Sequence, residues 1–270
     1  MTGQYRYRYS STILLLTYLL LVCGLVEVSS RSAVLNLEIN PICGFIAATN
    51  IESIFTEWAC DTVGQTVTNP CDDPVWVGLS CGQGPSNSSN ITSIQLASIG
   101  LSGSLSSSLG ALADLYSLDV SGNTLSGSLP AALGSLSLLL RLKLSNSPFT
   151  GTIPSEWGQL TSLDLMLVND NRLTGSIPPD FGSMAQLSYL NLNTNYLSGP
   201  IPEELFALTR LRTLYLYSNS LTGSLPSSLA AWGLMELLSF NDNLFTGPMP
   251  SSIGDMTFLR NLHLNRCLYE

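Results

Sequence analysis

The side chains that most often carry out catalysis are scarce in this sequence. His263 is the only histidine among the 270 residues, which excludes any metal site with two histidine ligands and argues against most acid–base enzymes. Glu203 and Glu204 form a carboxylate pair, but adjacent residues do not face each other productively, so we interpret them as solvated. Hydrolase, phosphate-loop, zinc-protease, kinase and dinucleotide motifs are absent from the sequence. The sequence therefore predicts a protein that is not an enzyme and that needs no cofactor or metal.

Cysteine chemistry depends on the compartment, and the first residues of the chain indicate secretion. Arg6 and Arg8 precede an apolar run of about 14 residues over 13–26, and small residues follow it. The run is shorter than the roughly 20 residues that cross a bilayer as a helix, so cleavage is favoured over the alternative of an uncleaved signal anchor. We predict residues 1–30 as a signal peptide, with no membrane span after it.

Removal of this signal peptide would take Cys23 away and leave five cysteines in the mature chain. They are Cys43, Cys60, Cys71, Cys81 and, much later, Cys267. The first four lie close together ahead of the regular region and would enter an oxidising compartment, where a pair of disulfides is expected. Zinc is the alternative, but the sequence has no CxxC pair and the ligand spacing does not fit a zinc site.

The charged residues and the glycosylation sequons indicate which classes of partner are possible. Only 11% of the residues are charged, with 10 Lys and Arg against 19 Asp and Glu, which gives a formal net charge of −9. Nucleic acid binding needs a basic face, so the composition excludes it. Asn87-Ser-Ser and Asn90-Ile-Thr are acceptor sequons for glycosylation, and crowding between sites three residues apart should limit occupancy to one.

The sequence contains a repeat of constant length, and the strands and turns of this repeat must position any functional side chain. The repeats begin at Ile91, Leu115, Leu139, Leu163, Leu187, Leu211, Met235 and Leu259, a 24-residue period with no insertion. They follow the pattern LxxLxLxxNxLxGx[LI]PxxLGxLxx, with departures at Ile99 and Ser106 in the first repeat, at Ser147 in the third and at Cys267 in the last, which is incomplete. A single repeat cannot bury its leucines, so the repeats must stack into a solenoid with a continuous core.

Each recurring position of the repeat has a structural interpretation. The LxL core, for example Leu190 and Leu192, alternates with period two and predicts a short strand with one face buried. Asparagine at the ninth position, as at Asn195, predicts a ladder of side-chain amides that satisfies backbone groups in the turn. The glycine of LxGx predicts a tight turn, and the following proline predicts a short helical turn instead of a long helix.

Residues between the inward leucines should project from the sheet, at the third, fifth, seventh and eighth positions of each repeat. Repeats five and six place three tyrosines together there, and tyrosine is common at recognition sites. The predicted ligand-binding residues are Tyr189, Asn191, Asn193, Tyr215, Tyr217 and Asp170. Leu165 and Leu167 are predicted as an exposed pair beside them. The alternative is that tyrosine occurs here because it suits strands.

The pattern resembles the plant-type extracellular leucine-rich repeat, whose hallmark is LxGxIP. It occurs here as LTGSIP over 173–178 and LSGPIP over 197–202, and the resemblance covers 91–270. The family's amino-terminal cap is similar to the segment from Cys71 through Trp76 and Gly78 to Cys81. The resemblance implies an α/β solenoid, a right-handed leucine-rich-repeat superhelix with a parallel concave sheet and short 3-10 or helical turns on its convex side.

The resemblance also implies a domain organisation and disulfide pairs. Residues 31–90 would form the cysteine-containing cap, and 91–270 would form eight repeats. The cap of the family usually holds one disulfide, here Cys71–Cys81, so Cys43 and Cys60 are an addition that we expect to pair with each other.

By resemblance, the function is non-catalytic binding of a protein or peptide ligand on the concave face of a secreted or cell-surface protein, with a co-receptor as a further partner. Two alternatives stay open: a truncated ectodomain of a receptor kinase or receptor-like protein, and a structural glycoprotein of the wall or matrix. The sequence shows no carboxy-terminal cap, so an exposed strand edge and a tendency to associate are expected at that end.

Overall fold

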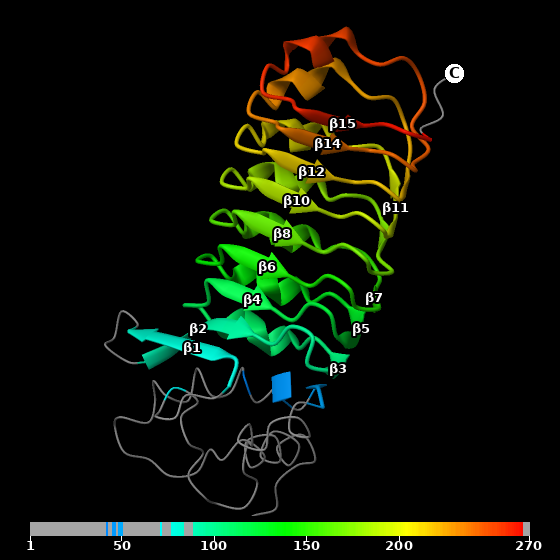
Figure 1. The fold of residues 1–270 in the computed structure, drawn as a ribbon. Coiled ribbons are helices and arrows are strands. Elements are labelled where there is room, and N and C mark those ends of the chain that lie inside the picture. The colour runs from blue at the N-terminus through cyan, green and yellow to red at the C-terminus, as the bar shows by residue number, and fades with distance from the viewer. Residues whose placement is uncertain are drawn as a thin grey trace, which may run out of the picture.

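The computed structural model describes residues 42, 45, 46, 48–50, 71, 77–83 and 89–266. Within them, one nine-stranded sheet runs along the whole solenoid (Figure 1). In spatial order its strands are β1 (Leu79–Gln83), β2 (Ser89–Gln95), β4 (Ser117–Asp119), β6 (Arg141–Lys143), β8 (Leu165–Leu167), β10 (Tyr189–Asn191), β12 (Thr213–Tyr215), β14 (Leu237–Ser239) and β15 (Asn261–His263). From β2 onward all neighbours are parallel, and each residue pairs with its equivalent in the next repeat. The predicted solenoid with a parallel sheet is confirmed.

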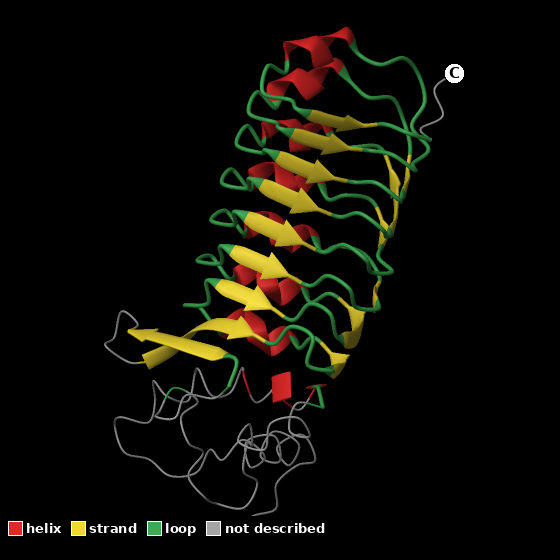
Figure 2. Cartoon of the chain, viewed as in Figure 1, coloured by secondary structure: helices red, strands yellow, loops and turns green. Residues whose placement is uncertain are grey.

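Short 3-10 helices cover the other side of the core (Figure 2). They are η1 (Ser107–Ala111), η2 (Ala131–Ser135), η3 (Ser155–Gln159), η4 (Pro179–Ser183), η5 (Glu203–Ala207), η6 (Ser227–Ala231) and η7 (Ser251–Asp255). A proline precedes each helix from η2 on, in extended conformation, because its ring fixes φ and it cannot donate a hydrogen bond. The predicted short helical turns after the proline are confirmed.

The glycines of the LxGx segments lie in or beside two further small sheets, which the sequence did not predict. One contains β3 (Ser102–Ser104), β5 (Thr124–Ser128) and β7 (Phe149–Thr150); the other contains β9 (Thr174–Gly175), β11 (Tyr196–Gly199) and β13 (Ser220–Leu221). The recurring glycine has φ between +78° and +103° in every repeat from Gly103 to Gly247. A side chain would strain this backbone, so the glycine is needed for its conformation along the side sheets.

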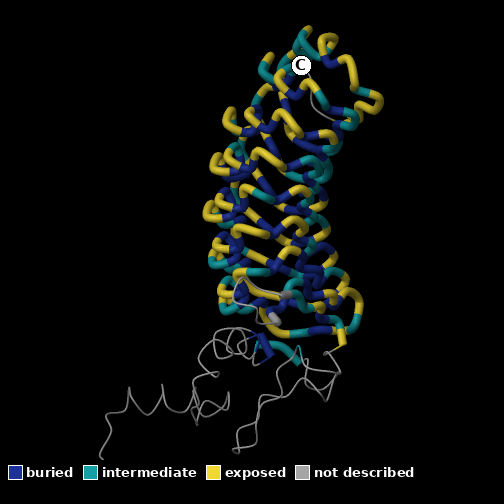
Figure 3. The backbone as a smooth tube through the Cα atoms, turned by 90° about the vertical axis from the view of Figure 1, so that its left-hand side faces the viewer, coloured by how far each residue is buried: buried dark blue, intermediate teal, exposed yellow. Residues whose placement is uncertain are grey.

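The core fills the space between the large sheet and the helices, and Figure 3 shows buried and exposed residues alternating along each coil. Within one repeat Leu190, Leu192 and Leu197 are fully buried. Where a tryptophan enters the core its polar edge has a partner: the Trp157 indole N–H donates to the Pro130 carbonyl oxygen at 3.1 Å. The core thus accommodates the polar edge of a large side chain together with the leucines.

The predicted asparagine ladder is present. Asn195 Nδ2 donates to the carbonyl oxygens of Val168 (3.0 Å), Leu192 (3.2 Å) and Asn193 (3.2 Å). Its Oδ1 accepts from the Leu173 backbone N–H at 3.0 Å. Each ladder asparagine therefore ties its own repeat to the preceding one, so the ladder fixes the spacing of the coils.

A cap closes the amino-terminal end of the core. β1 pairs antiparallel with β2, and Ile42, Phe45 and Ile46 are buried in the same apolar cluster as the repeats. Cys71 and Cys81 form a disulfide with their Cα atoms 5.7 Å apart, as predicted.

Several predictions concern residues that the structure does not describe. The signal peptide over 1–30, the Cys43–Cys60 pair, Cys267 and the Asn87 sequon all lie outside the described residues. Among the described residues, no helix has both the length and the apolar character needed to cross a membrane.

Candidate ligand-binding face

The six predicted binding residues come from three adjacent repeats and lie together on the outer face of the nine-stranded sheet, here named the sheet face. Asn191 of β10 pairs in register with Tyr215 of β12. Beyond the strands, the Asp170 N–H donates to the Asn193 carbonyl oxygen at 3.1 Å, and the Thr194 N–H donates to the Tyr217 carbonyl oxygen at 3.0 Å. The constant repeat length therefore places Asn193 and Tyr217, both at the seventh repeat position, in adjacent coils, and Asp170 lies beside Asn193 at the eighth position of the preceding repeat.

The three tyrosines form one aromatic group, named the tyrosine cluster. The ring centroids of Tyr189 and Tyr215 are 5.9 Å apart at 53°, and those of Tyr215 and Tyr217 are 6.0 Å apart at 86°. All three side chains are half-buried. Tilted and edge-to-face pairs hold rings in fixed positions while one side stays accessible, which suits contact with a ligand.

The environment of Tyr189 and of Tyr217 favours the protonated form of each phenol group. Burial, the neighbouring Tyr215 and a hydrogen bond with it, and the more distant Tyr217 all raise the pKa of Tyr189. Burial and the Asp170 carboxylate raise the pKa of Tyr217, as does Tyr215, whereas the Asn193 side chain opposes the rise. Tyr189 and Tyr217 thus present neutral hydroxyl groups near the Asp170 side chain.

Two expectations about this face need correction. Asn193 was expected to project into solvent, but it is 4% exposed, and its side chain hydrogen-bonds with the Tyr217 phenol of the next repeat. Leu165 and Leu167 were expected to be exposed, but they are half-buried in β8, in register with Tyr189 and Asn191 of β10. They extend the apolar side of the tyrosine cluster by one strand.

The eighth position of each repeat has a left-handed backbone, which was not predicted from the sequence. Asn146, Asp170, Thr194, Ser218, Asp242 and Arg266 have φ between +49° and +57°. The recurrence of Gly122, Asn146 and Asp170 at this position was the available signal, since Gly, Asn and Asp tolerate this region best. Thr194 is β-branched and has φ +49°, so the backbone is strained beside Asn193.

The remaining polar groups singled out by sequence lie elsewhere. On the sheet face, Lys143 Nζ lies 3.2 Å from the Asp119 carboxylate in the preceding strand, so this cation is already paired. His263 is exposed on β15. Glu203 and Glu204 are exposed on η5, as expected, and Glu203 accepts a hydrogen bond from the Ser228 hydroxyl at 2.9 Å.

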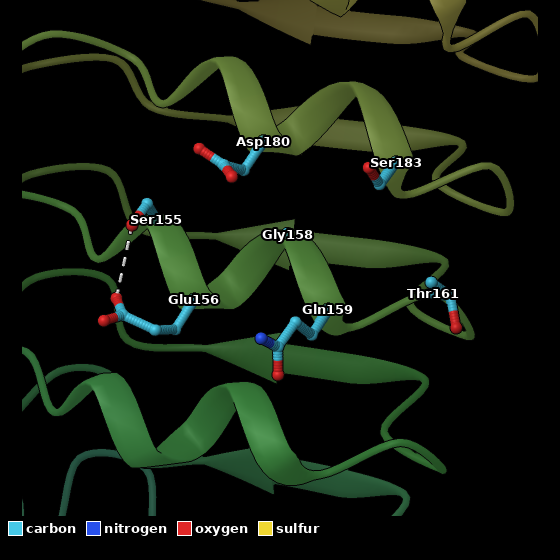
Figure 4. Close-up of a pocket in the computed structure, with 7 residues that line it drawn as sticks. All are labelled: Ser155, Glu156, Gly158, Gln159, Thr161, Asp180 and Ser183. Atoms are coloured by element: carbon cyan, nitrogen blue, oxygen red, sulfur yellow. Dashed lines mark hydrogen bonds between the residues drawn. The ribbon is translucent and has the colours of Figure 1, made fainter.

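The helix side carries a shallow hollow between η3 and η4 (Figure 4). Its polar lining includes Glu156, Gln159 and Asp180, and these side chains spread along the two helices without converging on one point. No group of three His, Cys, Asp or Glu side chains in the described part of the chain could hold a metal ion. The hollow therefore shows no arrangement for catalysis.

Comparison with known proteins agrees with this geometry. The sequence profile of the Leucine Rich Repeat family matches residues 114–136, 138–160, 159–184, 186–208 and 210–232. A complex of BIR3 with SERK2 from Arabidopsis thaliana contains a chain 32% identical to this one, with a TM-score of 0.56, and the match covers 67% of this chain and 93% of that one. This chain belongs to the plant-type extracellular leucine-rich-repeat family.

Larger leucine-rich-repeat ectodomains show the same fold. PEPR1, solved with AtPEP1, is 27% identical with a TM-score of 0.77 over 85% of this chain. The Arabidopsis receptor kinase HAESA, solved with the peptide hormone IDA and the co-receptor SERK1, is 27% identical with a TM-score of 0.65 over 87% of this chain. This chain spans 31% of the PEPR1 chain and 42% of the HAESA chain. No curated protein matches the sequence at a significant level.

Proposed function

We propose that this leucine-rich-repeat chain is an extracellular recognition module that binds an extended peptide segment on its sheet face, across the tyrosine cluster. The observation that carries the proposal is the contact of Tyr189, Tyr215 and Tyr217 across adjacent repeats, with each ring half-exposed. Aromatic side chains that are already held in place lose little conformational freedom on binding, and they often dominate the binding energy.

The dimensions of the sheet face suit an extended peptide. The eight parallel strands from β2 to β15 have seven gaps of roughly 4.8 Å, so the face runs about 34 Å. An extended chain covers at most about 3.5 Å per residue, so roughly ten residues could lie along it. The half-buried Leu165 and Leu167 would extend the contact beyond the tyrosine cluster.

The relatives support a peptide or protein partner. PEPR1 was solved with AtPEP1, and HAESA with a peptide hormone and a co-receptor. BIR3 was solved in complex with SERK2. By analogy, this chain would take a peptide and would contact a co-receptor, whether it acts alone or within a longer receptor.

The extracellular location is part of the proposal. The Cys71–Cys81 disulfide supports it, because such bonds persist in oxidising compartments. The signal peptide over 1–30, the Cys43–Cys60 pair and one glycan at Asn87 or Asn90 would follow from the same route. At the second sequon, Asn90 is 8% exposed and its side-chain amide donates to the Asp114 carboxylate, which favours Asn87 as the modified residue.

The test uses a displayed library of random ten-residue peptides, selected for capture by the secreted protein. Tyr215→Ala and Tyr217→Ala together should weaken binding of the selected peptides by about tenfold or more, because aromatic anchors dominate such contacts. The matched control is Tyr196→Ala, a tyrosine of β11 that is exposed on the side sheet. Equal binding by the double variant and the control, or no selected peptide at all, would overturn the proposal.

A further inference from the structure

Asparagine recurs at the seventh position of the repeats, on the sheet face, and its hydrogen bonds can be compared between repeats. Asn169 uses both ends of its amide: Oδ1 accepts from the Ser145 hydroxyl at 2.6 Å and Nδ2 donates to the Asp170 carboxylate at 2.6 Å. These bonds hold the amide in one orientation and leave neither end unpaired.

Asn241, three repeats later, is satisfied in the same way. Its Oδ1 accepts from the Ser239 hydroxyl at 2.7 Å, and its Nδ2 donates to the Asp242 carboxylate at 2.7 Å. A hydroxyl neighbour and a following aspartate are thus the means by which this repeat position completes its hydrogen bonds.

Asn193 lacks the aspartate, and the hydroxyl beside its side chain is the Tyr217 phenol, whose hydrogen bond with Asn193 opposes the rise in the pKa of that phenol. Thr194 follows it in place of aspartate, and the side-chain oxygen of Asn191 is turned to the backbone N–H of Asn193 at 3.1 Å. Asn193 is 4% exposed, and its Oδ1 has no hydrogen-bond partner among the described residues. An acceptor withdrawn from water without a donor is destabilising, so this residue is poorly explained by folding alone.

The residues beside Asn193 favour a positive donor. The Asp170 N–H donates to the Asn193 carbonyl oxygen, and the Thr194 N–H donates to the Tyr217 carbonyl oxygen, so Asp170 and Tyr217 come from the two flanking repeats. The Asp170 carboxylate accepts a hydrogen bond only from the neutral Asn169 amide among the described residues, so its charge is not compensated. The tyrosine faces carry negative π density, which attracts cations. Lys143, two strands away on β6, is already paired with Asp119 and does not neutralise this site.

We infer that Asn193, Asp170 and the tyrosine cluster form a subsite for an arginine side chain of the bound peptide. A guanidinium group is planar and has five N–H donors, so it can donate to the Asn193 Oδ1 and to the Asp170 carboxylate while it stacks on a tyrosine ring. Because the Oδ1 atom is covered in the free protein, arginine entry requires the Asn193 or Tyr217 side chain to move. This inference rests on the proposed peptide-binding function and specifies its ligand.

The test titrates the intact protein, with ¹³C-labelled tyrosine rings, with Nα-acetyl-arginine amide and with its neutral analogue Nα-acetyl-citrulline amide. We expect saturable shifts of the Tyr189, Tyr215 and Tyr217 ring signals with arginine, and binding of citrulline weaker by about tenfold or more. Equal binding of both compounds, or shifts spread over all tyrosines, would overturn the arginine subsite.

Matched variants separate a binding role from a structural one. Asn193→Ala should weaken arginine binding by about fivefold or more and leave the protein about as stable as before, because removing the unpaired Oδ1 offsets the loss of the hydrogen bond with Tyr217. Asn241→Ala should do the opposite, lowering stability and leaving arginine binding unchanged, because it breaks two hydrogen bonds that lie two repeats away from Asn193. Unchanged arginine binding in Asn193→Ala would contradict the inference.

The selected peptides distinguish this inference from the proposed function. Peptides that depend on Tyr215 and Tyr217 should contain an arginine whose replacement by citrulline weakens them to the same extent. If they depend on the tyrosines but tolerate that replacement, the arginine subsite is wrong and the peptide-binding function stands. If no peptide is selected, the proposed function fails, and the arginine subsite that rests on it fails as well.

Discussion

Two rows of asparagine run along this solenoid, two positions apart in each repeat, and they behave differently. The ladder row consists of Asn123, Asn171, Asn195, Asn219 and Asn243; the face row consists of Asn169, Asn193, Asn241 and Asn265. Ladder asparagines donate to carbonyl oxygens of two repeats and accept from a backbone N–H of the preceding one. Face-row asparagines depend on whichever side chains surround them. The same residue type is therefore a structural element in one row and a variable surface group in the other.

The difference follows from what each row contacts. Backbone groups are present in every repeat, so a ladder asparagine always finds its partners. Side chains change from repeat to repeat, so Asn169 and Asn241 are satisfied and Asn193 is not. A position that contacts side chains is free to acquire a binding role, and a position that contacts the backbone is not.

The largest expected effect is a difference in the free energy of unfolding between the alanine substitutions of Asn195 and of Asn193, two residues apart. Asn195→Ala should lower the free energy of unfolding by about 3 kcal/mol, because it leaves several buried backbone groups without partners. Asn193→Ala should change it by no more than about 0.5 kcal/mol, or raise it. Urea unfolding of both variants measures the difference. Equal losses of unfolding free energy in the two variants would show that the ladder row and the face row contribute equally to stability.

A glycine on the helix side tests the spacing that the ladder requires. A Cβ atom at Gly158 of η3 would lie 2.4 Å from the Asp180 carbonyl oxygen, so Gly158→Ala should force two coils apart and cost about 2 kcal/mol. Gly254 occupies the same repeat position in η7, with no atom within 4 Å, so Gly254→Ala should be neutral or stabilising by up to about 1 kcal/mol. Thermal unfolding of the pair measures this, and similar stability of the two variants would contradict tight packing at η3.

The ladder can also be extended where it is interrupted. Ser147 occupies a ladder position, and its hydroxyl reaches only the Asn123 carbonyl oxygen, at 3.2 Å. Ser147→Asn should add hydrogen bonds to neighbouring backbone groups and stabilise the protein by about 1 kcal/mol. The control is Ser145→Asn, which changes the face row two residues earlier and removes the bond to Asn169. Stabilisation by both variants would mean that asparagine helps for a reason other than the ladder.

The effect of the Asp170 carboxylate, which lies beside the face row, should be visible in a tyrosine titration. Burial and then the Asp170 charge raise the pKa of Tyr217 above its ordinary value of about 10, so the folded protein keeps this proton longer than the unfolded chain does. The resulting stability is complete below about pH 10 and is lost as the pH rises through the raised value. Asp170→Asn should lower the pKa of Tyr217, measured by ultraviolet difference absorbance against Tyr217→Phe. No change in the titration would place the carboxylate too far away to act.

The smallest effect on the fold is expected at a third kind of asparagine. Asn87→Gln should remove the glycan from secreted protein, whereas Asn90→Gln should leave the glycan in place, because the Asn90 amide is nearly buried and bound to Asp114. Mass spectrometry before and after glycosidase treatment measures the occupancy. A glycan retained in Asn87→Gln would place the modification at Asn90.

Much of this molecule could be predicted from the sequence because one pattern recurs at a constant interval along most of the chain. The alternation of Leu190 and Leu192 indicated the strands, the prolines before the helices indicated short turns, and Asn195 indicated the ladder. Each of these depends on local geometry and on neighbours that the repeat supplies by itself. The Cys71–Cys81 pair followed from the cap motif, and the register alone brought Tyr189, Tyr215 and Tyr217 to one face.

Only the tertiary structure decided the features that depend on contacts between particular neighbouring side chains and coils. The side sheets form because backbone groups of successive coils meet, as when the Tyr196 N–H donates to the Leu173 carbonyl oxygen at 2.7 Å. Leu165 and Leu167 are half-covered, and Asn193 is buried with an unpaired oxygen, because of what the adjacent repeats place beside them. The repeat pattern fixes which face a residue lies on, but the partners it meets there come from the neighbouring repeats, whose side chains the pattern leaves variable.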